Sequence, residues 1–126
     1  MSIDSAFKNS LLIPRLRKKL RPSLDDYLSD DYVGVAIHTS SIIIAVNQAT
    51  ADLLGYDVDE MTGMNAWLLF STKSADALMQ HLVEKSQDPY RAIALKKDKT
   101  EVEIELKGYD FEISGEPIRV VLWKEV

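Results

Sequence analysis

Residues 43–65 read Ile-Ile-Ala-Val-Asn-Gln-Ala-Thr-Ala-Asp-Leu-Leu-Gly-Tyr-Asp-Val-Asp-Glu-Met-Thr-Gly-Met-Asn, and this stretch decides the fold. It begins inside a β-branched run, residues 42–46, which is typical of a buried strand. Asn47 is of a type that begins helices and Gly55 of a type that ends them, so we expect a short helix between them. Residues 57–61 predict one further helical turn, which Gly63 ends.

The residues on either side of this stretch extend the pattern into a complete domain. Residues 33–38 form a second β-branched run, and three polar residues separate it from residues 42–46, which predicts an antiparallel hairpin. After the short helices, residues 71–87 predict one long amphipathic helix, and Asp88-Pro89 ends it. Three strands follow, at residues 90–97, 101–113 with a bend or a bulge at Gly108, and 118–123. This order predicts an α+β fold with helices on one face of an antiparallel sheet.

The stretch 43–65 closely resembles the central signature of PAS domains. The matching residues are Asn47, Ala49, Leu54, Gly55, Tyr56, Glu60, Gly63 and Asn65. Residues 96–98 resemble the hairpin that precedes a charged strand in the family, although Lys99 replaces its glycine. The resemblance covers residues 24–126, and it implies a five-stranded antiparallel sheet in the order 2-1-5-4-3 whose helices enclose a cavity.

The resemblance also implies a function. PAS domains are sensory modules that pair and regulate an output domain, such as a histidine kinase or a diguanylate cyclase. Two alternatives stay open: a stand-alone small-molecule-binding protein, and a regulator whose basic N-terminal segment contacts nucleic acid. The sequence has no glycine-rich phosphate loop, no Gly-x-Ser-x-Gly and no His-Glu-x-x-His, so we expect no catalytic residues and no enzyme activity in this chain itself.

The first 23 residues form a separate segment. Residues 1–22 contain six basic residues and one acidic residue, whereas residues 23–126 contain nine basic and nineteen acidic ones. That acidic body argues against nucleic acid as a partner of the domain. Apolar residues at helical spacing predict an amphipathic helix, and we expect a homodimer in which the two helices pack on the outer sheet faces or on each other. The interface residues would be Phe7, Leu11, Leu12, Leu16, Leu20, Val121 and Trp123.

The composition restricts the cofactors. The chain has no cysteine, and Ala66 stands where photosensory PAS domains carry the cysteine that reacts with flavin. Only His38 and His81 could ligate haem, and neither lies where haem-binding relatives carry their ligand. We therefore expect neither haem nor a flavin that forms a thiol adduct, and no metal site. No apolar run is long enough to span a membrane, and we expect a cytoplasmic protein.

A ligand cavity, if open, should lie between the long helix and the inner sheet face and take a small, mainly apolar molecule. The alternative is that large side chains fill this space, since protein interiors pack closely. Tyr56 and Asn65 are the expected polar anchors. The expected lining is Trp67, Phe70, Leu78, Met79, Leu82, Ile93, Leu95, Ile104 and Leu122. By resemblance, Glu60 should pair with a base in Lys96-Lys97 as a structural bridge.

Overall fold

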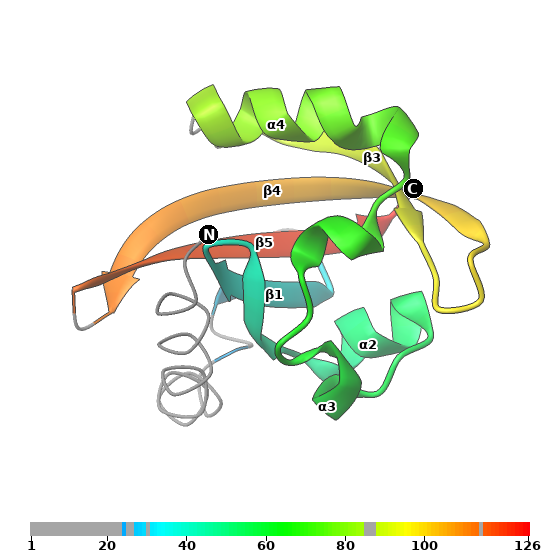
Figure 1. Ribbon diagram of the computed structural model, residues 1–126, viewed down its shortest axis with the longest axis horizontal. Coiled ribbons are helices and arrows are strands. Elements are labelled where there is room, and N and C mark those ends of the chain that lie inside the picture. Colours follow the sequence, from blue (N-terminus) through cyan, green and yellow to red (C-terminus); the bar gives the residue numbers. More distant parts are fainter. Residues whose placement is uncertain (1–23, 25–26, 30, 85–87, 114) are drawn as a thin grey trace, which may run out of the picture.

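The computed structural model describes residues 24, 27–29, 31–84, 88–113 and 115–126. It contains a single described sheet in the order β2-β1-β5-β4-β3, and every neighbouring pair is antiparallel, as expected (Figure 1). The strands are β1 (Gly34–Thr39), β2 (Ile42–Val46), β3 (Tyr90–Leu95), β4 (Glu101–Ile113) and β5 (Glu116–Glu125). The helices are α2 (Gln48–Leu54), α3 (Val58–Met61), η2 (Ala66–Leu69), η3 (Thr72–Ser74) and α4 (Ala75–Glu84).

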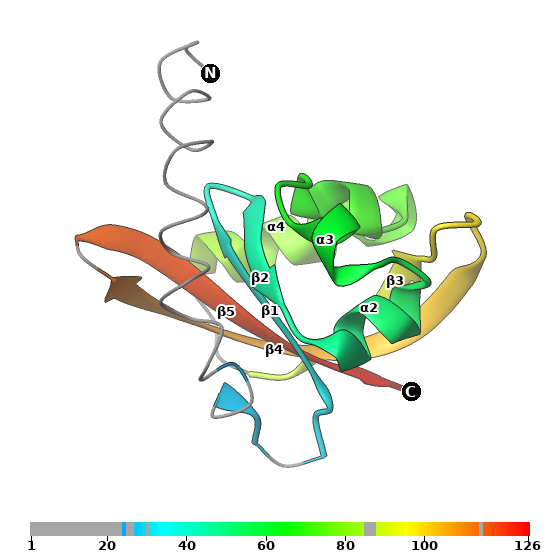
Figure 2. The ribbon, with the colours of Figure 1, turned by 90° about the horizontal axis from the view of Figure 1, so that it is seen from below.

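These helices gather on one side of the sheet, as Figures 1 and 2 show. The apolar core lies between them and the sheet, and its fully buried members include Leu54, Met61 and Leu69 from the helical side. A second apolar cluster lies on the other face of β1, β2 and β5, and its members include Val35, Ile37 and Ile44. The central strands are thus buried on both faces.

Asn47 joins helix α2 to strand β1. Its Oδ1 atom accepts hydrogen bonds from the backbone N–H of Thr50 and of Val35, and its Nδ2 atom donates to the carbonyl of Val33. Gly34 allows this close approach, because a Cβ there would lie 2.6 Å from Thr50 Oγ1. The helix ends at Gly55, whose φ of +79° is the left-handed value that glycine adopts at low cost. The family signature therefore has a direct physical basis.

The prediction of which β5 side chains point toward the helices is wrong, because the alternation along the strand is shifted by one residue. Val121 and Trp123 belong to the core beneath the helices, and not to the outer face where a dimer interface was expected. Ile118, Val120 and Leu122 point the other way, into the second cluster. Residues 118–123 are buried on both faces, so alternation of apolar and polar residues gives no signal there. Pairing with β1, which places Val121 opposite Ala36, sets the facing instead.

The charged strand behaves as expected, apart from its glycine. Val102, Ile104 and Leu106 are buried, and the glutamates between them face solvent. Gly108 introduces no bulge into β4, whose pairing with β5 runs without a shift in register from Ile104 to Ile113. In the turn between β3 and β4, Lys99 takes a φ of +72° in place of the family's glycine.

Three further predictions concern the ends of elements and the first residues. Helix α4 starts at Ala75 and not at residue 71, because Ser71 caps a short 3₁₀ turn that precedes it. The predicted N-terminal helix, with Phe7, Leu11, Leu12, Leu16 and Leu20, lies outside the described residues. Within the described part of the chain, no helix has the length and apolar character that a membrane crossing requires.

Candidate functional site

A cavity of about 50 Å³ lies between the inner face of the sheet and helices η2 and α4. Most of its wall is apolar. The residues that line it are Ala36, His38, Ser41, Ile43, Ala66, Trp67, Leu69, Phe70, Leu78, Tyr90, Arg119, Val121 and Trp123. This volume has room for a few water molecules or a molecule of a few heavy atoms. The space expected from the sequence is therefore open but small.

Three of the residues expected to line the cavity do so. They are Trp67 in η2, Phe70 directly after η2, and Leu78 in α4. The ring of Phe70 stacks on that of Trp123, with 5.3 Å between their centroids and 19° between their planes. Ile104 is buried in the same core but does not reach the cavity. The prediction thus identified part of the helical wall, which also includes Ala66 and Leu69.

Four other apolar residues that were expected to line the cavity lie elsewhere. Met79 is 52% exposed on α4, because it points away from the sheet. Ile93 and Leu95 pair with glutamates of β4 on its solvent-facing side, and Ala92 and Ala94 take the inner positions instead. Leu122 belongs to the second cluster. The side chain of Leu82 lies outside what the structure describes.

The two expected polar anchors, Tyr56 and Asn65, do not line the cavity either. Asn65 Oδ1 accepts a hydrogen bond from the backbone N–H of Trp67, which makes Asn65 the cap of η2. Tyr56 packs at the edge of the core, and the ammonium of Lys97 lies 5.9 Å from its ring centroid. Both residues of the signature therefore support local structure.

The β1–β2 turn holds η2 over the cavity. Ser40 and Ser41 both have positive φ values, 48° and 68°, which is the two-residue hairpin turn that matches the strand twist. This turn points the carbonyl of Ser41 at the backbone N–H of Ala66, at 2.7 Å. The indole Nε1 of Trp67 donates to Ser41 Oγ at 3.2 Å. These two bonds place Ala66 and Trp67 in the cavity wall.

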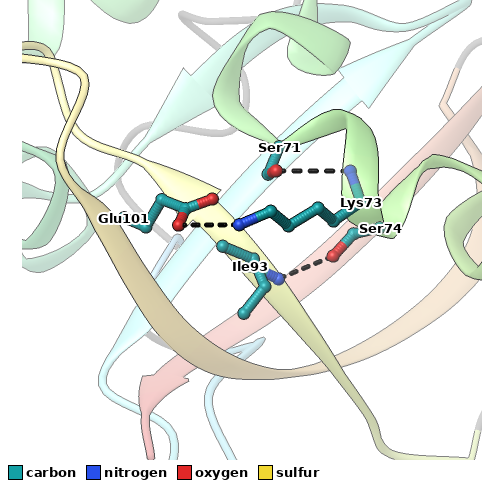
Figure 3. A network of polar contacts seen from close by, with 5 residues as sticks. All are labelled: Ser71, Lys73, Ser74, Ile93 and Glu101. Carbon is teal, nitrogen blue, oxygen red and sulfur yellow. Dashed lines mark hydrogen bonds and ion pairs between the residues drawn. The ribbon is translucent and has the colours of Figure 1, made fainter.

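The start of α4 is attached to the edge strand β3, as Figure 3 shows. The Ser74 hydroxyl accepts a hydrogen bond of 2.7 Å from the backbone N–H of Ile93, and the Ser71 N–H donates to the Ile93 carbonyl at 2.9 Å. Lys73 Nζ forms an ion pair of 3.2 Å with Glu101 Oε1 on β4. These bonds pair part of the otherwise open edge of β3 and hold the segment that precedes α4 against the sheet.

Among the residues of the cavity that sequence reasoning missed, Arg119 is the charged one. It lies on β5 and is only 5% exposed. Its Nη1 atom donates to Asp110 Oδ2 at 3.2 Å, whereas Nε and Nη2 have no hydrogen-bond partner. A Cβ on Gly108 would lie 2.5 Å from Nη2, so the glycine provides the space for the guanidinium. A single arginine within the apolar run of residues 118–123 was the signal in the sequence.

The other two titratable side chains that line the cavity, His38 and Tyr90, are uncharged at neutral pH. His38 lies directly opposite Arg119 on β1, and burial, followed by the charge of Arg119, lowers its pKa from 6.5 to about 4. Burial raises the pKa of the Tyr90 hydroxyl, and Arg119 opposes that rise. The interaction between Tyr90 and Arg119 leaves the Nε and Nη2 atoms of Arg119 without a hydrogen-bond partner. Arg119 is therefore the one fixed charge among the described residues that line the cavity.

The lining of this cavity differs from that of the photosensory, flavin-binding relatives at three positions. Ala66, at the position of the reactive cysteine, lines the wall, and Trp67 and Phe70 occupy the positions of polar groups in the photosensory relatives. His38 lines the cavity, although it lies on the first strand and not where haem-binding relatives carry their ligand. The cavity is nevertheless several times smaller than the ~300 Å³ at which pockets for larger ligands begin. In the described part of the chain, no three metal-ligating side chains converge.

The expected bridge at Glu60 is confirmed. Glu60 Oε2 lies 2.6 Å from Lys97 Nζ, which joins helix α3 to the end of β3. The hydrogen bond from Lys97 lowers the pKa of the Glu60 carboxyl, and the same bond raises the pKa of the Lys97 ammonium. Both groups are exposed, so the bridge acts as a structural contact at the surface.

Comparisons with known proteins agree with this architecture. The family model described as PAS domain matches residues 30–126. The PAS domain of an HTR-like protein from Haloarcula marismortui has a TM-score of 0.67 and 17% identity, over 90% of this chain and 96% of that one. The PAS domain of a two-component sensor histidine kinase has a TM-score of 0.67 and 15% identity, over 86% and 99%.

A fungal LOV domain photoreceptor also has this fold, with a TM-score of 0.65 and 19% identity, over 92% of this chain and 91% of that one. None of the curated proteins matches the sequence. At identities this low, the solved structures show a common fold and leave the chemistry of each cavity to its own residues.

Proposed function

The chain belongs to the PAS domain family of sensory modules, and from this premise we propose that it binds a small molecule in its internal cavity and regulates an output domain. The catalytic activity belongs in this proposal to the output, such as a histidine kinase or a diguanylate cyclase, and not to the chain itself. Its shared fold with the PAS domain of a two-component sensor histidine kinase supports this role.

The observation that carries the proposal is the cavity. Protein interiors close up by default, and empty space in a core costs stability. Here the space of about 50 Å³ is kept open by Ala36 and Ala66, which are small, between the large rings of Trp67, Phe70 and Trp123. The lining spans β1, β5, η2 and α4, so a bound molecule would contact both layers of the fold.

The experiment is to reduce the cavity without touching the surface. Small molecules are screened against the full chain by two-dimensional NMR, and hits are measured on Ala66→Trp, whose indole would occupy the space. Ala77→Trp is the matched control, because Ala77 is exposed on α4. Binding that is lost in Ala66→Trp and kept in Ala77→Trp supports the proposal. Equal binding to both variants contradicts it.

We further propose that the chain forms a homodimer through the apolar stripe of its first residues. Val121 and Trp123 no longer take part in this proposal, since both are buried beneath the helices. Sedimentation of the full chain should show a dimer that Leu16→Glu converts to a monomer. Ser10→Glu, a polar position in the same segment, should leave the dimer intact. The same oligomeric state in all three proteins would contradict this proposal.

A further inference from the structure

Building on that proposed function, we infer that Arg119 anchors the ligand and that the ligand is a small carboxylate with a compact apolar body. The guanidinium of Arg119 is a buried charge that is only partly paired. Arg119 is buried, its carboxylate partner Asp110 has a side chain that is 44% exposed, and its Nε and Nη2 atoms have no hydrogen-bond partner. A buried charge is stable only when its donors are paired, and one bond to a partly solvated carboxylate satisfies one of five N–H groups.

The unpaired donors have the right geometry for two oxygens. Nε and Nη2 form one edge of the guanidinium, where two N–H bonds run parallel, the arrangement that a carboxylate matches with its two oxygens. A Cβ on Gly108 would lie 2.5 Å from Nη2, 2.8 Å from Cζ and 3.1 Å from Nε. Because Cζ is no farther than Nε, Gly108 packs against the flat face of the group, which leaves the edge clear of this strand.

The rest of the wall selects the same ligand class. The described buried side-chain atoms without a partner are Nε and Nη2 of Arg119 and Nε1 of Trp123, and all three are donors. The site therefore needs an acceptor, and the fixed positive charge rejects cations. The opposite wall, with Trp67, Phe70 and Leu78, is apolar and suits a short hydrocarbon body. Both nitrogens of Arg119 are closed to solvent, and the cavity that Arg119 lines is the space from which a carboxylate would reach them.

The test compares two molecules of the same shape on the full chain. Butyrate carries the carboxylate, and butyramide replaces it by a neutral amide. Affinities are measured by NMR titration, with the side-chain Nε–H signal of Arg119 as a local probe. We expect butyrate to bind at least about tenfold more tightly than butyramide, because a hydrogen bond to a charged group contributes that much or more. We also expect it to shift the Arg119 signal.

Two variants complete the test. Arg119→Met keeps the length of the side chain without charge or donors, and should abolish the preference for butyrate. Arg91→Met makes the same change at an exposed position and should preserve it. Equal affinities for the two molecules, no binding of butyrate, or unchanged binding to Arg119→Met would each overturn the inference. Neutral molecules that bind the wild type but not Ala66→Trp would still support the sensory cavity, so the two proposals fail separately.

Discussion

Gly108→Ala tests whether this glycine exists to make room for Arg119. The added Cβ would lie 2.5 Å from Nη2 and 2.8 Å from Cζ of the guanidinium, both closer than real Cβ contacts. Arg119 is tied to Asp110 on one side, so it must either strain or swing into the cavity. In a strand free of this clash, the same change would be mildly stabilising, because alanine loses less backbone entropy than glycine on folding.

The magnitude follows from these two opposing effects. Overpacking a buried site costs about 1–3 kcal/mol, and the entropy gain of Gly→Ala offsets about 0.4–1 kcal/mol of it. We expect a net loss of about 1–2 kcal/mol in the free energy of unfolding. In an Arg119→Ala background the obstacle is gone, so Gly108→Ala should become neutral or stabilising. The coupling energy of this double-mutant cycle should then be about 1–3 kcal/mol, which is the cost of overpacking.

Urea unfolding of the four proteins, followed by the fluorescence of Trp67 and Trp123, measures this cycle. At the ~1–3 kcal/mol/M dependence usual for small proteins, the single variant should lower the midpoint by about 1 M. The same shift in the Arg119→Ala background would refute the reasoning, since it would mean that some other atom opposes the Cβ. A change in the slope would point instead to a change in the unfolded state.

Three further outcomes are expected from the contacts described above. Because the ion pair with Lys97 holds the Glu60 pKa below 4.5, its contribution is present at neutral pH and is lost as the pH falls through the folded-state pKa. Glu60→Gln should therefore lower the urea midpoint more at pH 7 than at pH 3, and equal losses at the two pH values would contradict this. The His38 pKa falls from 6.5 to about 4 on folding, so the unfolded chain binds the extra proton and stability should rise with pH between those values. His38→Gln should flatten that rise in urea midpoints, and an unchanged slope would exclude His38 as its source. Asn47→Ala removes an acceptor and a donor that join α2 to β1 and should cost about 2–3 kcal/mol in urea unfolding. Asn47→Asp keeps the acceptor and should cost less, whereas equal losses would show that the acceptor contributes little.

The order and type of the elements follow from the sequence alone, because local rules govern them. Asn47 and Gly55 bound α2, and each acts through its own backbone neighbourhood: a side-chain cap at one end and a left-handed φ at the other. Residues 101–107 alternate charged and apolar side chains, so their two faces could be assigned before any contact was known. The Glu60 bridge was predicted from the resemblance to the PAS signature, which implies a base in Lys96-Lys97 as its partner, and not from a local rule.

The facing of β5 and the chemistry of the cavity were decided by tertiary structure alone. Where both faces of a strand are buried, as at Val120 and Val121, either facing satisfies the apolar pattern, and only the register with a neighbouring strand selects one. That selection turns Arg119 inward, beside Gly108 on β4 and His38 on β1. These residues are far apart in the chain, and the unpaired guanidinium edge arises only when three strands meet, because no local pattern encodes a contact between distant backbones.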